Sequence, residues 1–135
     1  FFWLLFTELM RVLKPQGLLY VNAPSNGAYH RYPVDCWRFY PDSGVALQNW
    51  ARREGYATTL LESYICDQAQ RGWNDFVAVF VKDSSYASSY TARMKNEFST
   101  WSNGRDVESD EIQRRIRYSE DQRRRKIAEN SRKRR

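Results

Sequence analysis

The sequence predicts an α/β fold in which helices cover a sheet. Residues 2–13 carry apolar side chains at steps of three and four, the period of an amphipathic helix. Residues 18–21 form a short apolar run between turn signals, which is typical of a strand buried on both faces of a parallel sheet. Residues 57–65 and 73–81 are apolar and β-branched and predict an antiparallel strand pair. The expected order is helix, parallel strand, helix and antiparallel strand pair, in a mixed sheet.

Turn and capping residues mark the ends of these elements. Pro15 disfavours a helix at the residue before it, and Gly17 can adopt the positive φ of a turn. A second helix is expected to begin near Asp42 and Ser43, which supply N-terminal capping groups, and to end at Gly55. The first helix, the tight turn and the buried strand together correspond to half of a β-α-β unit.

Composition divides the chain near residue 83. Residues 1–83 carry equal numbers of basic and acidic side chains, so the formal net charge of +6 lies entirely in residues 84–135. Because apolar side chains are dense only in the first part, we expect an α/β domain at 1–83 and a basic polar tail at 84–135. The charged stretch 108–135 is expected to be a solvated helix or disordered. Four apolar side chains at four-residue spacing predict one amphipathic helix earlier in the tail: Tyr86, Tyr90, Met94 and Phe98.

Several classes of protein are disfavoured by the sequence. Cys36, Cys66 and a single histidine cannot supply the usual four ligands of zinc, so no metal is expected. The cysteines are expected to be buried or half-buried thiols of a reducing compartment, which favours a cytoplasmic protein. The apolar opening of six residues is too short for a membrane span and lacks the basic region of a signal peptide. The chain begins inside an apolar pattern and without Met, so we expect a fragment that lacks its upstream part.

The segment 22–41 concentrates the reactive and aromatic side chains. Its three prolines exclude a continuous helix, and Ser25-Asn26-Gly27 is a turn signal, so an irregular loop is expected. The loop follows the carboxyl end of the predicted strand at 18–21. In open α/β sheets ligands bind in the crevice at the carboxyl ends of the strands. The segment is therefore the candidate site.

Two segments resemble the class I S-adenosylmethionine-dependent methyltransferases. Residues 8–21, ELMRVLKPQGLLYV, resemble the E-x-x-R-V-L-K-P-G-G-x-h-x-h segment around the start of the fifth strand, with Gln16 in place of the first glycine. Residues 29–41, YHRYPVDCWRFYP, resemble the H-x-Y-P-x-D-x-W-R-F-x-P segment of a type 11-like subgroup often associated with glycan and polysaccharide synthesis. The resemblance covers residues 1–83.

The resemblance implies a Rossmann-like fold and methyl transfer from S-adenosylmethionine to a small-molecule or glycan-precursor substrate. Members of the family hold the cofactor with a glycine-rich loop after the first strand and an acidic residue at the end of the second. This chain has neither, since it contains no G-x-G-x-G run. It would then be the C-terminal half of the fold, with the cofactor-binding loop absent, and by itself it is expected to be inactive.

His30 and Asp35 are the candidate catalytic residues. A neutral imidazole can accept a proton from a hydroxyl or amine during methyl transfer, or His30 could instead hydrogen-bond within its own loop and fix its shape. Asp35 could act as a base or orient His30. The alternative for Asp35 is an ion pair with Arg31 or Arg38 that holds the loop closed, and this alternative is favoured.

Seven residues are candidates for substrate binding. Amide and hydroxyl side chains at the strand end can reach a substrate, and methyl transfer depends mainly on such positioning. Arg38 could bind a phosphate or carboxylate, or stack on an aromatic ring. The aromatic side chains, including Tyr40, could line a sugar or nucleotide pocket or only pack the loop. The seven are Asn22, Pro24, Ser25, Asn26, Tyr32, Trp37 and Arg38.

A different class of function is a non-catalytic binding module that presents the tail to nucleic acid or an acidic partner. Its basic side chains could neutralise phosphates. Acidic residues are interleaved with many of them, however, and a dense basic cluster ends the chain at 131–135. Nucleic acid is therefore not the expected partner.

Overall fold

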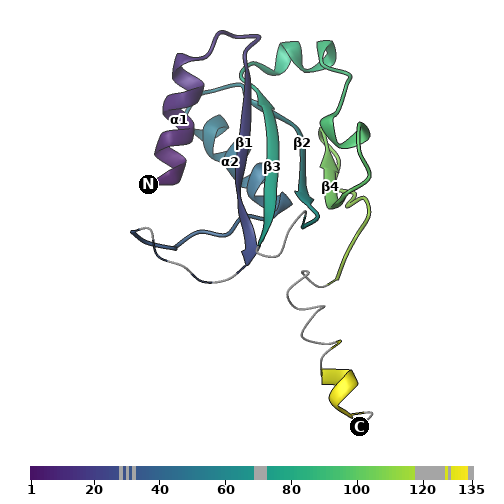
Figure 1. Ribbon diagram of the computed structural model, residues 1–135. Helices are drawn as coiled ribbons and strands as arrows, with labels where there is room; N and C mark the ends of the chain where they lie inside the picture. Colours follow the sequence, from purple (N-terminus) through teal and green to yellow (C-terminus); the bar gives the residue numbers. More distant parts are fainter. Residues whose placement is uncertain are drawn as a thin grey trace.

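The computed structural model describes residues 1–27, 29, 31, 33–68, 73–117, 127 and 129–133. Helices, strands and short 3₁₀ helices follow one another in a mixed α/β arrangement, and residues 127 and 129–133 near the C-terminus are also helical (Figure 1). Their bounds are α1 (Phe2–Val12), β1 (Leu18–Gly27), α2 (Pro41–Arg53), β2 (Thr59–Cys66), β3 (Trp73–Val81), η1 (Ser84–Ser89), η2 (Met94–Asn96) and β4 (Trp101–Asp106). The predicted helix, strand, helix and strand pair are confirmed.

The four strands form one sheet in the order β1-β3-β2-β4, and each pair of neighbours is antiparallel. The antiparallel pairing of β2 with β3 is confirmed. The prediction that β1 is buried on both faces of a parallel sheet is wrong for the described residues, because β1 pairs with β3 alone and its side chains alternate between exposed and half-buried up to Pro24. The described part of the chain is an antiparallel sheet with helices, and not a clear Rossmann-like fold.

The main core lies between the sheet and the helices α1 and α2. Alternate residues of β3, Phe76, Ala78 and Phe80, face this side and are fully buried. The ring of Phe6 in α1 meets the ring of Phe80 edge-on, with centroids 4.8 Å apart. The two helices are joined directly, since the indole N–H of Trp50 donates to the hydroxyl of Thr7 at 3.0 Å.

The opposite face of the sheet is partly covered by residues that follow β3. The single amphipathic helix predicted from Tyr86 to Phe98 is wrong, because this stretch forms two short 3₁₀ helices, η1 and η2. The carboxylate of Glu62 accepts the backbone N–H groups of Met94 at 2.8 Å and Lys95 at 3.2 Å, which holds the chain in this bent path. β4 then pairs with β2, so the sheet extends beyond residue 83.

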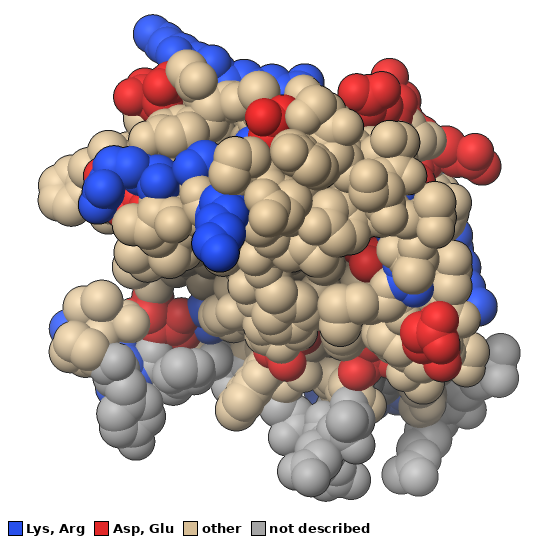
Figure 2. All heavy atoms as spheres, turned by 90° about the horizontal axis from the view of Figure 1, so that it is seen from above, with Lys and Arg blue, Asp and Glu red and all other residues tan. Residues whose placement is uncertain are grey.

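The surface of the described residues carries both signs of charge. Seen from above, Lys and Arg occur on the same face as Asp and Glu, around a largely uncharged centre (Figure 2). This face therefore lacks the single-sign patch that nucleic-acid binding usually requires. Residues 118–126, 128 and 134–135 of the predicted tail lie outside the described residues. Among the helices that the structure describes, none has the length and apolar character needed to cross a membrane.

Candidate functional site

The first part of the predicted loop is a strand. Asn22 to Gly27 continue β1 and pair with β3, with a register shift between Pro24 and Asn26. Pro24 is tolerated here because its nitrogen lies on the outer edge of the sheet, where no ladder hydrogen bond to β3 is needed. The turn expected at 25–27 is therefore wrong, and the bulge at Ser25 takes its place.

The four candidates at the strand end divide into buried and exposed residues. Ser25 and Asn26 are buried, and the side-chain oxygen of Asn26 accepts the backbone N–H of Asn74 at 3.2 Å. Asn26 thus joins β1 to β3. Asn22 and Pro24 are exposed, so of the four they are the ones placed to meet a ligand from solvent.

Ser25 is the unusual member of this group. It is fully buried, and within the described residues its hydroxyl has no hydrogen-bond partner. A buried hydroxyl without a partner costs free energy, of the order of 1–3 kcal/mol. Ser25 does not line the groove between α1, the segment 33–40 and α2. We therefore assign it no ligand.

Asp35 and Arg38 form a bidentate salt bridge within the segment 33–40, which leads into α2. Nη1 and Nη2 of Arg38 each donate to one carboxylate oxygen of Asp35, and the distance from Nη2 to Oδ2 is 2.6 Å. The side chain of Asp35 is 5% exposed and that of Arg38 is 27% exposed. The hydrogen bond to Asp35 raises the pKa of Arg38 above its usual value. The ion pair predicted for Asp35 is confirmed with Arg38, and a role of Asp35 as base stays a prediction.

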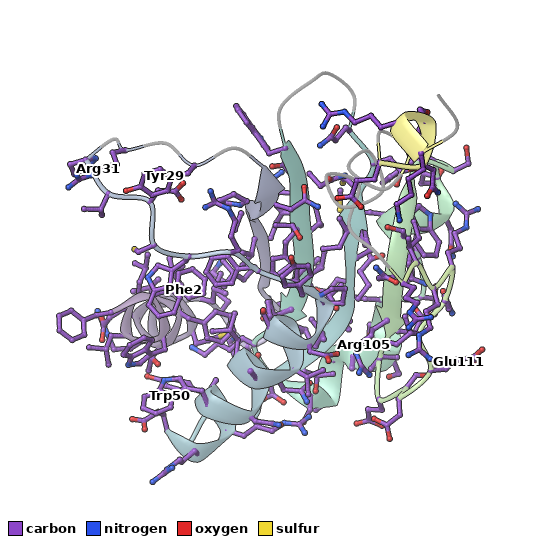
Figure 3. The ribbon with its side chains drawn as sticks, turned by 90° about the horizontal axis from the view of Figure 1, so that it is seen from below. Phe2, Tyr29, Arg31, Trp50, Arg105 and Glu111 are labelled. Atoms are coloured by element: carbon purple, nitrogen blue, oxygen red, sulfur yellow. The ribbon has the colours of Figure 1, made fainter. Side chains whose placement is uncertain are left out.

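Two candidates lie outside the described residues. These are His30 and Tyr32, so the structure assigns them no position. Their neighbours Tyr29 and Arg31 are exposed, and Figure 3 shows both well away from Phe2 and Trp50.

The aromatic candidate Trp37 lines a groove between α1, the segment 33–40 and α2. The groove encloses about 530 Å³. The ring centroids of Phe39 and Phe2 lie 4.6 Å apart. The ring centroids of Trp3 and Trp37 lie 6.0 Å apart, and the two ring planes make an angle of 87°. Its lining residues are Phe2, Trp3, Trp37, Arg38, Phe39, Ser43, Ala46, Leu47 and Trp50.

Sequence reasoning found only part of this groove. Trp37 and Arg38 are candidates from the sequence, whereas Phe2 and Trp50 fall on the apolar faces of the two predicted helices and Trp3 is not singled out. The available signal was that both predicted helices carry tryptophan, which is too large to be fully buried in most cores. Tyr40 is 49% exposed and is not among the lining residues.

The groove is suited to binding a flat apolar surface. Among the described residues that line it, Arg38 is the only charged one, and Asp35 and the Trp37 carbonyl already accept from its Nη groups. The hydroxyl of Ser43 accepts the N–H of Tyr40, and Trp50 donates to Thr7. None of the described lining residues has a carboxylate, imidazole or thiol side chain that could act as a base, so their contribution to a reaction would be to position a substrate.

Comparisons with known proteins and the search for metal ligands add no assignment. No protein-family model, curated protein or solved structure matches the chain. Among the described residues, no three His, Cys, Asp or Glu side chains are grouped so that they could hold a metal ion. The function must therefore be argued from the residues and their geometry.

Proposed function

We propose that residues 1–83 are the substrate-binding half of a class I methyltransferase domain that acts on a small molecule or a glycan precursor. The resemblance of residues 8–21 and 29–41 to segments of that family supports the proposal. The order helix, strand, helix and strand pair is also the one that the resemblance implies for this half.

The main structural support for the proposal is one backbone hydrogen bond. The backbone N–H of Phe39 donates to the carbonyl of Pro24 at 3.0 Å. The contact holds the segment 33–40 against the carboxyl end of β1, and the side chain of the same Phe39 lines the groove. The aromatic groove therefore lies next to the exposed Pro24 at the carboxyl end of β1.

The residues present do not fit the cofactor. No part of the chain matches the glycine-rich loop or the acidic residue of the family, so we derive no step through S-adenosylmethionine. What this half contributes is the alignment of the acceptor atom. Alignment can account for several kcal/mol of the barrier to a transfer reaction, without any proton acceptor in the groove.

The first experiment uses the protein together with its upstream coding sequence. Isothermal titration with S-adenosylmethionine should show binding by the longer protein and none by the 135-residue chain alone. A longer protein that fails to bind S-adenosylmethionine, or an upstream sequence without a glycine-rich segment after a strand, would refute the proposal.

The second experiment tests the groove. Trp37→Ala in the longer protein should lower methyl transfer, followed as S-adenosylhomocysteine formed with a panel of nucleotide sugars and simple glycosides, and leave S-adenosylmethionine affinity unchanged. Tyr29→Ala is the matched control, because Tyr29 is an exposed aromatic residue of the same connection. Equal turnover of the two variants would exclude the groove. His30→Ala and Asp35→Asn should likewise lower turnover more than cofactor affinity.

A further inference from the structure

A bulge in β2 turns a carboxylate toward the face of the sheet opposite the helices. The register with β3 shifts between Leu60 and Glu62. Leu60 packs in the core under α2, and the hydroxyl of Ser63 donates to the carbonyl of Pro41 at 3.0 Å, so both face the helices. In a regular strand Glu62 would face the helices as Leu60 does, because side chains alternate. The bulge adds one residue, and Glu62 therefore faces the opposite side together with Leu61.

Glu62 ends a row of three neighbours that crosses the sheet. Val79 of β3 pairs with Glu62 on one side and with Tyr20 of β1 on the other. Directly paired residues point to the same face, so the three side chains lie side by side. Neighbouring strands are about 4.8 Å apart, which places positions 20 and 62 about 10 Å from each other.

This row is the floor of a pocket of about 500 Å³, a size that small ligands occupy. The segment 89–97, which follows β3, forms the wall. Tyr20 is 50% exposed and Met94 44% exposed, so an apolar ligand can reach both. The residues that would contact such a ligand are Leu18, Tyr20 and Val79 from the sheet and Tyr90 and Met94 from the wall.

The negative charge of Glu62 is not neutralised within the described residues. The residue is 2% exposed, and its two oxygens each accept one backbone N–H, from Met94 and Lys95. No described Lys or Arg forms an ion pair with it, since the ammonium group of Lys95 pairs with Asp106. A carboxylate offers about four acceptor positions, so two remain. Buried charges are normally paired, which makes Glu62 a receptor for a cation.

The one basic residue among the described residues that line the pocket is Arg93, and it is engaged elsewhere. Its Nη1 donates to the carbonyls of Tyr90 and Ala92, and its Nε lies 3.6 Å from the carboxylate of Asp106. The exposed Glu97 adds a second carboxylate to the lining. The charges of the pocket are therefore complementary to a cation.

We propose that this pocket binds a small organic amine in its protonated form, with an apolar or aromatic body. The ammonium group donates to the carboxylate of Glu62, in a charge-assisted hydrogen bond. The body lies along Val79 and reaches the ring of Tyr20, about two strand spacings away. The inference is independent of the proposed function, because the pocket and the aromatic groove lie on opposite faces of the sheet.

Titrations of the 135-residue chain followed by NMR test the site with three probes that share one body: phenylbutylamine, phenylbutanol and phenylbutyrate. The amine should bind about tenfold more tightly than the other two, since it alone gains a hydrogen bond to a charged group. It should also shift the amide resonances of Met94 and Lys95, whose N–H groups share the carboxylate. Equal affinities for the three probes, no binding of the amine, or binding without those shifts would overturn the proposal.

Variants of the floor complete the test. Glu62→Gln should weaken phenylbutylamine binding about tenfold and leave phenylbutanol binding unchanged, because the amide keeps the shape and loses the charge. Glu62→Gln also removes a backbone acceptor, so Tyr20→Ala provides a second change, at an exposed position, and should weaken all three probes. Tyr86→Ala is the matched control, since Tyr86 is an exposed tyrosine of η1 outside the lining. An amine affinity unchanged by Glu62→Gln, or equal effects of the two tyrosine changes, would contradict the site.

Discussion

The ammonium group of Lys95 lies 2.8 Å from the carboxylate of Asp106, and the lysine side chain is only 2% exposed. The same ammonium group donates to the side-chain oxygen of Gln113 at 2.9 Å and lies 5.5 Å from the centre of the Trp101 ring. A buried ammonium group is stable only when its charge is paired and its protons are hydrogen-bonded. This contact therefore fastens η2 to β4.

Asp106→Asn tests the contact. We expect the free energy of unfolding to fall by about 3 kcal/mol, because the change leaves a buried lysine without its counter-charge. Urea denaturation followed by tryptophan fluorescence measures it. Glu8→Gln is the matched control, since the ion pair of Glu8 with Arg11 is exposed on both sides and should contribute little. A loss no larger than in the control would show that the buried pair does not hold this part of the fold.

Glu62 offers a second test on the same face. Each of its carboxylate oxygens accepts one backbone N–H, from Met94 and Lys95, and the residue is 2% exposed. In Glu62→Gln one oxygen becomes an NH₂ group that cannot accept, so we expect a loss of about 1–3 kcal/mol. Hydrogen exchange should show faster exchange at Met94 and Lys95, while amides of α1 stay unchanged. Uniform loss of protection over both regions would contradict a local role.

Gly104 is required by its contact with Trp101. A Cβ at position 104 would lie 2.5 Å from Cζ3 of the Trp101 ring, which is 7% exposed. Gly104→Ala should therefore destabilise the protein by about 1–3 kcal/mol through overpacking. The same change in a Trp101→Leu background should cost much less, since the clashing ring is gone. A cost of equal size in both backgrounds would assign the effect to the backbone and not to Trp101.

The two cysteines should react at different rates. Cys36 is exposed, contrary to the expectation that both are buried, whereas Cys66 is half-buried as expected. Burial raises the pKa of Cys66 above its usual value of 9.0, so a smaller fraction is the reactive thiolate at any pH below it.

Ellman's reagent at pH 8 should give a fast phase from Cys36 and a phase at least tenfold slower from Cys66. Cys36→Ser should remove only the fast phase, and Cys66→Ser only the slow one. The slow rate should continue to rise as the pH is increased above 9, because ionisation of Cys66 is displaced to higher pH. A single rate for both thiols would contradict the assignment.

Periodicity was a good guide to the helices and the strand pair. The apolar steps of three and four predicted α1, and the alternation from Phe76 to Val81 matches the two faces of β3. The apolar run at 18–21 could not reveal that β1 pairs antiparallel with β3, because the identity of a strand's neighbour is decided by contacts between residues some sixty positions apart in sequence.

The candidate site was predicted only in part. The ion pair of Asp35 with Arg38 could be expected, since the two residues are close in sequence and opposite in charge. The groove could not, because it requires Trp3, Trp37 and Trp50 from three separate elements to lie together. The polar character of Ser25 and Asn26 did not predict their burial either. Both side chains are buried at the bulge of β1, where the register with β3 shifts.

The sequence by itself determined where α1, α2, β2 and β3 form, because helix and strand periods and capping residues act over a few neighbouring positions. Only the tertiary structure decided that two charged residues, Glu62 and Lys95, are buried, and that the half-buried Asp106 pairs with Lys95. Their burial depends on partners that arrive from distant parts of the chain and repay the cost of removing charge from water. The same long-range pairing makes β1 an outer strand of the sheet that the structure describes, which no local pattern could show.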